Sequence, residues 1–208
     1  METHRLCIGN SKPLYLDITK KLSVIEEILN LTILKLEQDD IEILNDFEEI
    51  SKSLGDLETI ISTYLLNCLL SEYTDSSKQV SNSIHKLSSK KQGALIVIEK
   101  DDPVLPYISD GTPINAQISS ALLESIFQEE STLKNGAVLI KSNLIVSAAN
   151  KLPLTEQIFW DRMFDYREIS AIGLSERCDA LILLIYENGT TSFSLDGNIY
   201  PFSRHQKQ

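Results

Sequence analysis

Two apolar, β-rich segments separated by two small polar residues constrain the fold of this chain more than any other feature. The first is Ala137-Val138-Leu139-Ile140, the second begins at Leu144, and Ser142-Asn143 connects them. Apolar runs on either side of a two-residue turn predict a β-hairpin. Strands without polar alternation are typical of a sheet that is covered on both faces. Helices are therefore expected on both sides of this hairpin.

The turn in front of the first segment is Asn135-Gly136, which leads directly into Ala137. Glycine has no Cβ, so a phosphate group or a metal ion can approach the backbone closely at such a turn. The same residues also suit a purely structural turn, in which Gly136 supplies the backbone conformation and Asn135 caps the bend. The local pattern alone leaves both interpretations open.

Apolar runs and turn residues continue over 93–202 and define the fold class. The continuous apolar strands predict an α/β (α+β) fold with a mixed β-sheet flanked by helices. Thr155 is expected to cap one of these helices. The expected strands cover 93–99, 137–141, 144–150, 180–186, 191–195 and 198–202, with a loop or short strand at 111–116, and the expected helices cover 118–127, 156–164 and 167–175.

Residues 1–72 show helical periodicity instead, with apolar residues recurring every three or four positions. Pro13 argues against an early start of the first helix. Asp39-Asp40 is expected to end the first helix and cap the second, and Gly55-Asp56 to separate the second from the third. The expected helices cover 18–38, 43–54 and 57–68.

The predicted organisation is a small N-terminal helical unit (1–72), a linker (73–92), an α/β domain (93–202) and a short tail (203–208). The linker is rich in Ser, Lys and Asp, and a short helix is expected within it over 79–87. Two interpretations of the helical unit stay open. It is either an oligomerisation or regulatory unit, or a small helical domain or cap over the downstream core.

Composition excludes several classes of protein. The 208 residues carry a formal net charge of -11, spread over both halves, and no basic stripe occurs, which argues against binding a nucleic-acid polymer. The cysteines, Cys7, Cys68 and Cys178, lie far apart, as in a reduced cytoplasmic chain. No apolar run is long enough to span a bilayer. We therefore expect a cytoplasmic protein that does not enter the membrane.

Seven short blocks, in one order, give the α/β domain a family resemblance. Together they resemble the diadenylate cyclase domain (DisA_N/DAC) and cover slightly more than half of the chain. The N-terminal helices are similar to those of the soluble, sporulation-type branch, where helices replace a membrane anchor and mediate assembly. The matching blocks are 93–99, 111–116, 119–123, 135–138, 147–154, 170–176 and 179–182.

The resemblance implies an enzyme, a nucleotidyltransferase that condenses two ATP molecules into cyclic di-AMP and pyrophosphate. It also implies a divalent metal, Mn or Mg, and a homo-oligomer whose catalytic domains face each other, because each domain holds one ATP. By this resemblance, Asn135, Arg167 and Glu187 are the catalytic candidates, with Asn135 and Glu187 at the metal. The nucleotide-binding candidates are Gly111, Thr112, Gly136, Ala137 and Arg167.

The chain departs from the family at each motif. An Asp-Gly-Ala motif becomes Asn135-Gly136-Ala137, which loses the negative charge of the aspartate. An Arg-His-Arg motif becomes Arg167-Glu168-Ile169, which keeps one arginine, and a Ser-Glu-Glu-Thr-Gly loop becomes the shorter Tyr186-Glu187-Asn188-Gly189. These substitutions predict weakened activity. The alternative is a catalytically silent member that binds nucleotide or acts as an assembly partner.

Plain structural roles also account for individual residues. Arg167 suits a surface helix, Glu187-Asn188-Gly189 suits a hairpin turn, and Thr112 suits a turn closed by its own hydroxyl. The sequence therefore names a set of site candidates without showing that they meet.

Overall fold

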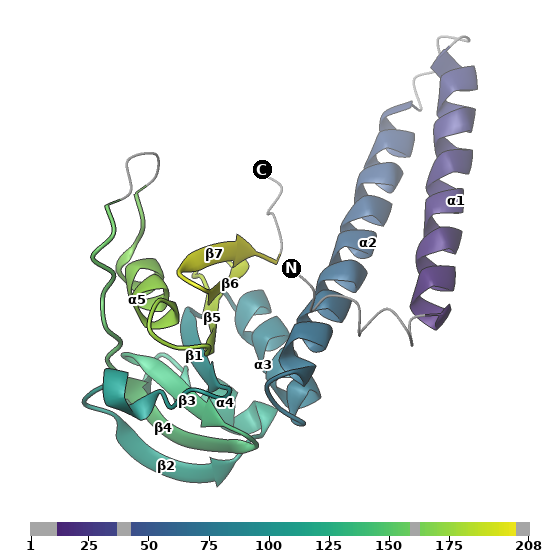
Figure 1. Ribbon diagram of the computed structural model, residues 1–208. Coiled ribbons are helices and arrows are strands. Elements are labelled where there is room, and N and C mark those ends of the chain that lie inside the picture. The colour runs from purple at the N-terminus through teal and green to yellow at the C-terminus, as the bar shows by residue number, and fades with distance from the viewer. Residues whose placement is uncertain (1–11, 37–42, 159–162, 203–208) are drawn as a thin grey trace. The chain divides into compact units, whose positions relative to one another are not determined.

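A computed structural model describes residues 12–36, 43–158 and 163–202, which fall into two compact units. The first unit ends at Leu65 and the second begins at Leu66. Helix α2 (Ile43–Ser71) contributes residues to both units. Each unit is described separately below, with the ribbon shown in Figure 1.

The first unit consists of α1 (Lys12–Leu36) and the greater part of α2, lying side by side (Figure 1). Ile25 of α1 and Ile50 and Leu57 of α2 form its small buried core. Lys35 Nζ lies 2.9 Å from an Asp46 carboxylate oxygen, and the Thr32 hydroxyl donates to the same carboxylate, so polar contacts hold one end of the pair. The predicted helical character of this unit is confirmed.

Two details of that prediction are wrong. Helix α1 begins at Lys12 and includes Pro13, because a proline in the first helical turn removes an N–H that has no intrahelical acceptor. The helices expected over 43–54 and 57–68 are one continuous helix, α2, with Gly55 in its interior. Glycine lowers helix stability without ending the helix when the flanking residues pack. Asp39-Asp40 lies outside the described residues, as does the expected tail 203–208.

Among the described residues of the second unit, seven strands form one mixed sheet in the order β2-β4-β3-β1-β5-β6-β7. The central strand β1 runs parallel to β3 and antiparallel to β5, and the remaining neighbours are antiparallel. The strands are β1 (Ala94–Glu99), β2 (Thr112–Gln117), β3 (Ala137–Lys141), β4 (Leu144–Asn150), β5 (Leu181–Ile185), β6 (Thr191–Leu195) and β7 (Asn198–Pro201).

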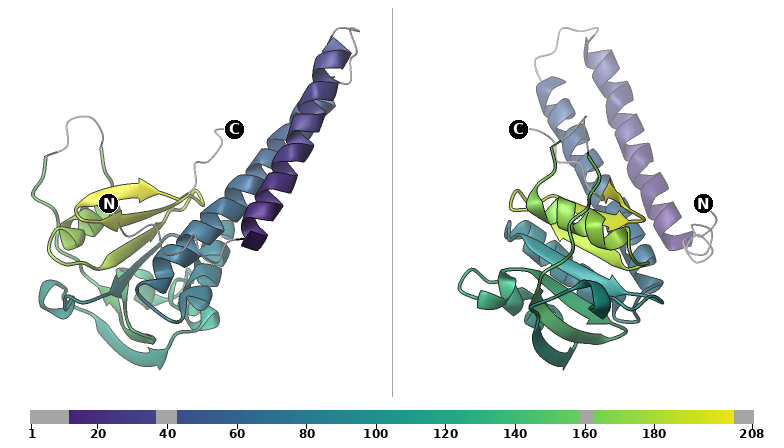
Figure 2. Two further views of the ribbon diagram at one scale, coloured as in Figure 1. Left: turned by 45° about the vertical axis from the view of Figure 1, so that its right-hand side comes forward. Right: turned by 60° about the vertical axis from the view of Figure 1, so that its left-hand side comes forward.

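Helices cover both faces of this sheet, as the apolar strands predicted (Figure 2). On one face, Ile96 and Ile98 of β1 pack in a cluster with residues of α3 (Ser77–Ser89), α4 (Ser120–Ile126) and the end of α2. On the other face, Leu95 and Val97 pack with Ala171 and Leu174 of α5 (Tyr166–Ser175). Burying each such aliphatic side chain contributes about 1.5–3 kcal/mol. Alternate residues of β1 thus face two different cores.

The segment expected to be a linker contains α3, which is longer than the helix predicted over 79–87. Its residues Val80, Ile84 and Leu87 are almost fully buried in the core of the second unit. Lys86 of α3 and Lys90, which caps its C-terminus, form ion pairs with Glu124 of α4. These pairs lower the pKa of the Glu124 carboxyl group to about 2. The helix therefore packs as an integral part of the second unit.

The helix predicted over 156–164 is wrong for the residues described. Residues 156–158 and 163–164 are not helical, and 159–162 lie outside the described part of the chain. Thr155 does not cap a helix, because its hydroxyl donates to Glu176 and accepts from the backbone N–H of Gln157. The two-residue connection Ser142-Asn143 is confirmed, with Ser142 in the left-handed region at φ 54°.

The continuity of α2 can be tested at Gly55. A Cβ added to this residue would meet no atom within 4 Å. We expect Gly55→Ala to stabilise the helix by about 0.5–1 kcal/mol, because alanine loses less backbone entropy in a helix interior. Urea unfolding followed by far-ultraviolet circular dichroism measures the change.

Gly173→Ala in α5 is the contrasting control. Its methyl group would overlap the backbone of Pro153 and Leu154, so the expected change is a loss of about 1–3 kcal/mol. A destabilised Gly55→Ala protein would contradict a helix that runs through this position.

Candidate functional site

The register of three neighbouring strands brings one end of each to the same edge of the sheet. Leu95 of β1 is paired with Ala137 of β3 in parallel, so Gly93 and Asn135 lie at equivalent positions just before the two strands. Ala94 is paired with Ile185 in the antiparallel β1–β5 pair, which places Tyr186 next to Gly93. The candidate site is defined here as this edge together with the N-terminus of α5.

Gly136 is required by the close packing of the protein's own backbone. Its φ is +150°, and a Cβ there would lie 2.6 Å from the carbonyl carbon of Ala149 and 2.7 Å from the carbonyl oxygen of Asn150. The structural role considered for this glycine therefore accounts for it without a ligand. Ala137 is buried, and its carbonyl oxygen accepts a hydrogen bond from the Asn150 side chain at 2.8 Å.

Asn135 follows a short 3-10 helix, Thr132–Lys134, and its side chain is exposed. Within the part of the chain that the structure describes, this side chain forms no hydrogen bond, so its amide oxygen is available to a ligand. An amide oxygen is a neutral ligand for a hard cation and binds it more weakly than a carboxylate.

Arg167 and Glu187, two of the predicted catalytic residues, do meet. Arg167 lies in the first turn of α5, and its Nη2 is 3.1 Å from Glu187 Oε1 beyond the end of β5. The side chains are 38% and 75% exposed, respectively, so solvent screens the pair and it contributes little to stability. The arginine is thus accessible, but its charge is already balanced by an acid.

The N-terminus of α5 is capped by the chain's own carboxylates. Asp165 Oδ1 accepts from the backbone N–H of Glu168 at 2.8 Å, and Glu168 Oε2 accepts from the backbone N–H of Asp165 at 3.0 Å. This reciprocal capping box satisfies donors that a helix N-terminus otherwise offers to an anion. Two negative charges therefore lie where the positive end of the helix would attract a phosphate.

Glu168 is also held from the sheet side. It is 4% exposed, and its Oε1 accepts a hydrogen bond of 2.8 Å from the Tyr186 hydroxyl. Burial, followed by the contact with Glu168, raises the pKa of Tyr186 above its ordinary value of 10.0. The tyrosine therefore stays protonated as a donor, and the carboxylate of Glu168 is fixed at the helix end.

Gly111 and Thr112 lie at a different part of the sheet, next to Asn150. A Cβ on Gly111 would be 2.9 Å from Asn150 Cγ and closer still to its amide oxygen. Asn150 is 3% exposed and joins this region to β3, because it accepts from Ser147 and donates to Ala137. Thr112 is exposed in β2. A hollow of about 280 Å³ borders Gly111, Ser147 and Asn150.

Sequence reasoning placed Glu168 and Tyr186 within the compared motifs but missed their contact and the capping by Asp165. It also missed Asn150 and Gly93 as residues that shape the site. The pattern Asp165-x-x-Glu168 before an apolar helix is a capping-box signal and could have been found. The other contacts depend on strand register and on tertiary packing, for which the local sequence carries no signal.

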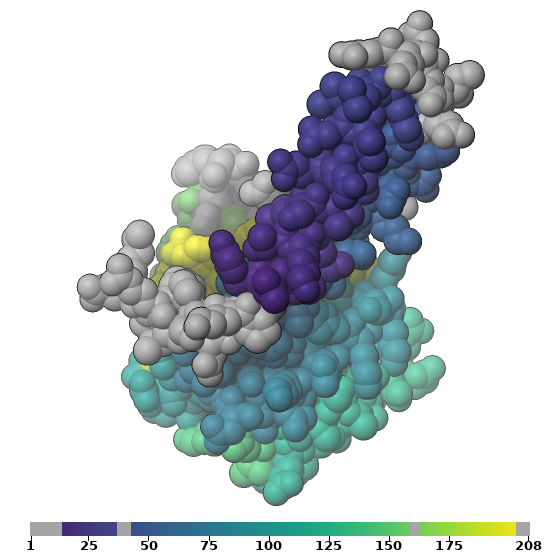
Figure 3. All heavy atoms as spheres, turned by 90° about the vertical axis from the view of Figure 1, so that its right-hand side faces the viewer, coloured from purple at the N-terminus to yellow at the C-terminus, as the bar shows by residue number. Residues whose placement is uncertain are grey.

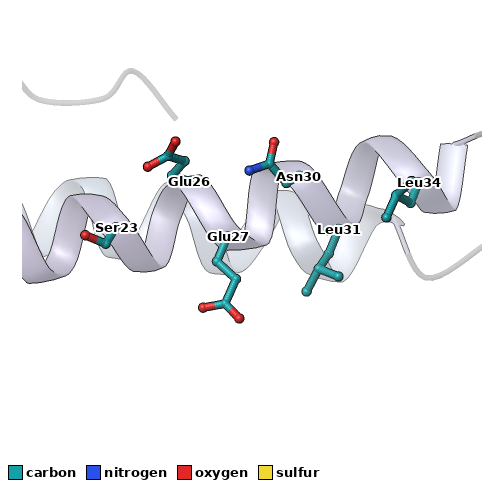
Figure 4. Close-up of a pocket in the computed structure, with 6 residues that line it drawn as sticks. All are labelled: Ser23, Glu26, Glu27, Asn30, Leu31 and Leu34. Carbon is teal, nitrogen blue, oxygen red and sulfur yellow. The ribbon is translucent and has the colours of Figure 1, made fainter.

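No metal-ligand cluster of three or more His, Cys, Asp or Glu side chains occurs among residues 12–36, 43–158 and 163–202. A further hollow, shown in Figure 4, runs along α1, and the residues that line it all come from that one helix. Glu26 and Glu27 point to opposite sides of the helix there, so the hollow does not gather them into a site. Its lining residues are Ser23, Glu26, Glu27, Asn30, Leu31 and Leu34.

Comparison with known proteins decides the family. Residues 81–199 match the family described as DisA bacterial checkpoint controller nucleotide-binding, and residues 8–73 match the N-terminal region of diadenylate cyclase CdaS. The chain is 41% identical over 196 residues to diadenylate cyclase CdaS of Bacillus thuringiensis, a match that covers 94% of this chain and 98% of that one. The chain belongs to the diadenylate cyclase family. The predicted resemblance, including the branch with N-terminal helices, is confirmed.

Further relatives agree with this assignment. Cyclic di-AMP synthase CdaS of Bacillus subtilis is 39% identical over 85% of this chain and 87% of its own length. A crystal structure from Bacillus cereus, described as a hypothetical membrane spanning protein, superposes with a TM-score of 0.80 at 40% identity and covers 95% of this chain and 98% of that one. The structure of DacA from Staphylococcus aureus, a double mutant, superposes with a TM-score of 0.57 at 30% identity. The match covers 61% of this chain and 85% of that one.

DacA matches only part of this chain and has the lower TM-score, whereas the Bacillus cereus structure matches almost the whole of this diadenylate cyclase family member. None of the helices in the described ranges combines the length and apolarity that crossing a bilayer requires.

The contact between Tyr186 and Glu168 can be tested by Tyr186→Phe. Loss of the hydroxyl removes one donor from a buried carboxylate, so we expect the free energy of unfolding near pH 7 to fall by about 1–3 kcal/mol. Urea titration of the full chain measures it. Tyr107→Phe is the control, because Tyr107 is 41% exposed. Equal stability of the two variants would show that the contact contributes nothing.

The same pair predicts a pH dependence. Because the folded state raises the pKa of Tyr186, its stabilising effect is complete below pH 10.0 and is lost as the pH rises towards the folded pKa. Above pH 10.0, stability of the unmodified protein should therefore fall more steeply than that of Tyr186→Phe. Unfolding titrations at a series of pH values from 8 to about 12 test this sign. Parallel curves for the two proteins would exclude it.

Proposed function

We propose that this chain binds ATP at the edge formed by the starts of β1 and β3 and the end of β5, and that two such chains condense two ATP molecules into cyclic di-AMP. The observation that carries the proposal is the convergence of Asn135, Arg167 and Glu187 on this edge in a member of the diadenylate cyclase family. The reaction would take place in the cytoplasm, where ATP is available.

The chemistry requires two symmetric substitutions at phosphorus. The ribose 3′-oxygen of each ATP attacks the α-phosphorus of the other, and the bond from that phosphorus to the bridging oxygen of the leaving pyrophosphate breaks. Each hydroxyl proton passes to a base or to water. Such a step depends mainly on in-line positioning and on neutralisation of phosphate charge. Two domains must therefore face each other with one nucleotide each.

Arg167 is the residue proposed to contact phosphate, since its guanidinium group is exposed at the candidate site. On binding, it would exchange its contact with Glu187 for a charge-assisted contact to a phosphate oxygen. Asn135 and Gly136 would border the nucleotide at the start of β3, with Ala137 directly behind them. Gly111 and Thr112 stay proposed nucleotide contacts, at the neighbouring part of the sheet around Asn150.

The side chains at this edge fit a divalent metal that is shared with the substrate. Asn135 would supply an amide oxygen and Glu187 a carboxylate, while Mg²⁺ or Mn²⁺ commonly takes its remaining ligands from phosphates and water. Such an ion would neutralise phosphate charge when bound. Glu187 is 75% exposed, so its carboxylate can turn from Arg167 towards an ion at little cost.

The same geometry favours low activity. Arg167 is the cationic side chain at the helix end, whereas Asp165, Glu168 and Glu187 are acids in contact with its helix or its guanidinium group. This balance is unfavourable for a triphosphate, and Asn135 provides no charge that would strengthen metal binding.

A second candidate function is favoured by the capping box of α5. If Asp165 and Glu168 keep the helix end closed to phosphate, the chain is a catalytically silent member that binds nucleotide weakly or assembles with active copies. Cyclic di-AMP production distinguishes the two candidates.

The full chain incubated with ATP and Mn²⁺ or Mg²⁺ should form cyclic di-AMP, measured by liquid chromatography and mass spectrometry. Arg167→Ala should reduce the rate by about tenfold or more, the value of one charge-assisted contact to phosphate. Lys78→Ala, which removes the same charge at an exposed position of α3, should leave it unchanged. Formation of product at equal rates by both variants would contradict the proposed role of Arg167. Absence of product from the unmodified chain would favour the silent function.

Restoring the family motifs provides the companion experiment. The triple variant Asn135→Asp, Glu168→His and Ile169→Arg regains the metal-binding carboxylate and the basic phosphate site. We expect its rate to exceed that of the unmodified chain by at least about tenfold, provided that circular dichroism shows a folded protein. A folded, assembled variant without increased activity would contradict the placement of the site.

We also propose that α1 and α2 join copies of this chain. Each helix carries a second apolar stripe beside the buried seam, at the seven- and four-residue spacing of a helical bundle, and the stripe residues are 38% to 73% exposed. Figure 3 shows the outer side of α1. A second copy offers matching stripes, so two hairpins can bury them together. The stripes are Tyr15, Leu22, Leu29 and Ile33 on α1, and Phe47, Leu54, Ile61 and Leu65 on α2.

Charges placed on the α1 stripe should therefore dissociate the assembly. Leu22→Lys with Leu29→Lys is expected to lower the mass measured by light scattering. Leu16→Lys with Leu34→Lys adds the same charge about 140° around the helix from Leu29 and should leave the mass unchanged. Identical masses for the two double variants would exclude the stripe as an interface.

A further inference from the structure

The guanidinium group of Arg167 lies directly over the α-carbon of Gly93. A Cβ built on Gly93 would be 2.8 Å from both Cζ and Nη2 of Arg167, and closer still to Nη1. All three atoms belong to the planar end of the arginine side chain. The glycine precedes β1, and the arginine comes from the first turn of α5, so the contact joins the sheet edge to the helix.

Backbone conformation does not explain a glycine at this position. Gly93 is not among the residues with positive φ, which include Gly136, Gly189 and Gly197. Alanine can therefore adopt the same backbone angles without strain. The nearest atoms that an added methyl group would meet all belong to the flexible end of Arg167. What the missing Cβ provides here is room for the guanidinium group.

We propose that Gly93 is a positioning residue for Arg167. By leaving the space over its α-carbon free, it lets the end of the guanidinium group come up against the start of β1, with Nη2 directed to Glu187. In this position the guanidinium group lies at the edge of the sheet where the nucleotide phosphate is proposed to bind. An alanine would push the arginine outwards and misalign its planar donor fork, whose direction sets the strength of a bidentate phosphate contact. The inference rests on the proposed function, because it assigns Gly93 a role at that same site.

Nucleotide affinity tests this role. The probe is 3′-deoxy-ATP with Mg²⁺, which lacks the attacking hydroxyl and so binds without turnover, and isothermal titration calorimetry of the full chain measures its Kd. We expect Gly93→Ala to weaken binding about three- to tenfold and Arg167→Ala about tenfold. Gly55→Ala, which has no atom within 4 Å of the added methyl, should bind as the unmodified chain does.

The double variant separates positioning from a general structural effect. If Gly93 acts through Arg167, then Gly93→Ala in the Arg167→Ala background causes no further loss of affinity. Equal losses in the two backgrounds would overturn the proposal, because the effect would then be independent of the arginine. Weaker binding by Arg167→Ala combined with unchanged binding by Gly93→Ala would also overturn it while leaving the proposed function intact. Failure of the unmodified chain to bind would overturn both.

A second measurement needs no nucleotide. In the ¹H–¹⁵N spectrum of arginine side chains, the Nε–Hε signal of Arg167 is identified as the one absent from Arg167→Lys. Gly93→Ala should shift this signal towards the position of a solvated arginine, while the other arginine signals stay in place. An unchanged Arg167 signal would show that Gly93 does not set the position of the guanidinium group.

Discussion

The pairing of β1 with β3 on one side and β5 on the other is the constraint on which the rest of the second unit depends. Because β1 is parallel to one neighbour and antiparallel to the other, the starts of β1 and β3 coincide with the end of β5. Alternate residues of β1 are buried in two different cores. A register slip would therefore disrupt the packing of both cores at once. Positions that are distant in sequence, such as Gly93, Asn135 and Glu187, are therefore fixed at one edge.

The chemistry of that edge reflects how α5 is terminated. Its capping box and the Tyr186 hydroxyl together give the buried Glu168 carboxylate its hydrogen-bond donors. A buried carboxylate without donors would be costly, so these contacts belong together energetically. Arg167 is directed away from this arrangement, towards Glu187 and over Gly93. At this helix end, the Glu168 carboxylate has its hydrogen-bond partners within the protein, whereas the Arg167 guanidinium group is exposed to solvent.

The sequence supported the fold well where apolar periodicity is strong. The strands around the Ser142-Asn143 turn and the helix α5 follow from local pattern, and the family blocks fixed the class of the second unit. One error arose where packing outweighed a helix-breaking residue, as at Gly55 inside α2. Another arose where a segment rich in polar residues also carries a buried apolar face, as in α3. The site candidates Arg167 and Glu187 were identified individually, but their contact depends on strand register. The contribution of Gly93 depends on the position of the Arg167 side chain, which no local pattern encodes.

The capped end of α5 has a consequence for the ligand-free protein. A helix whose terminal N–H groups wait for a bound phosphate gains order when the ligand arrives, and its folding is coupled to ligand concentration. Here Asp165 and Glu168 take that place within the chain itself. The start of α5 is therefore held in place without nucleotide, and any stabilisation by bound ATP adds to contacts that the chain already makes.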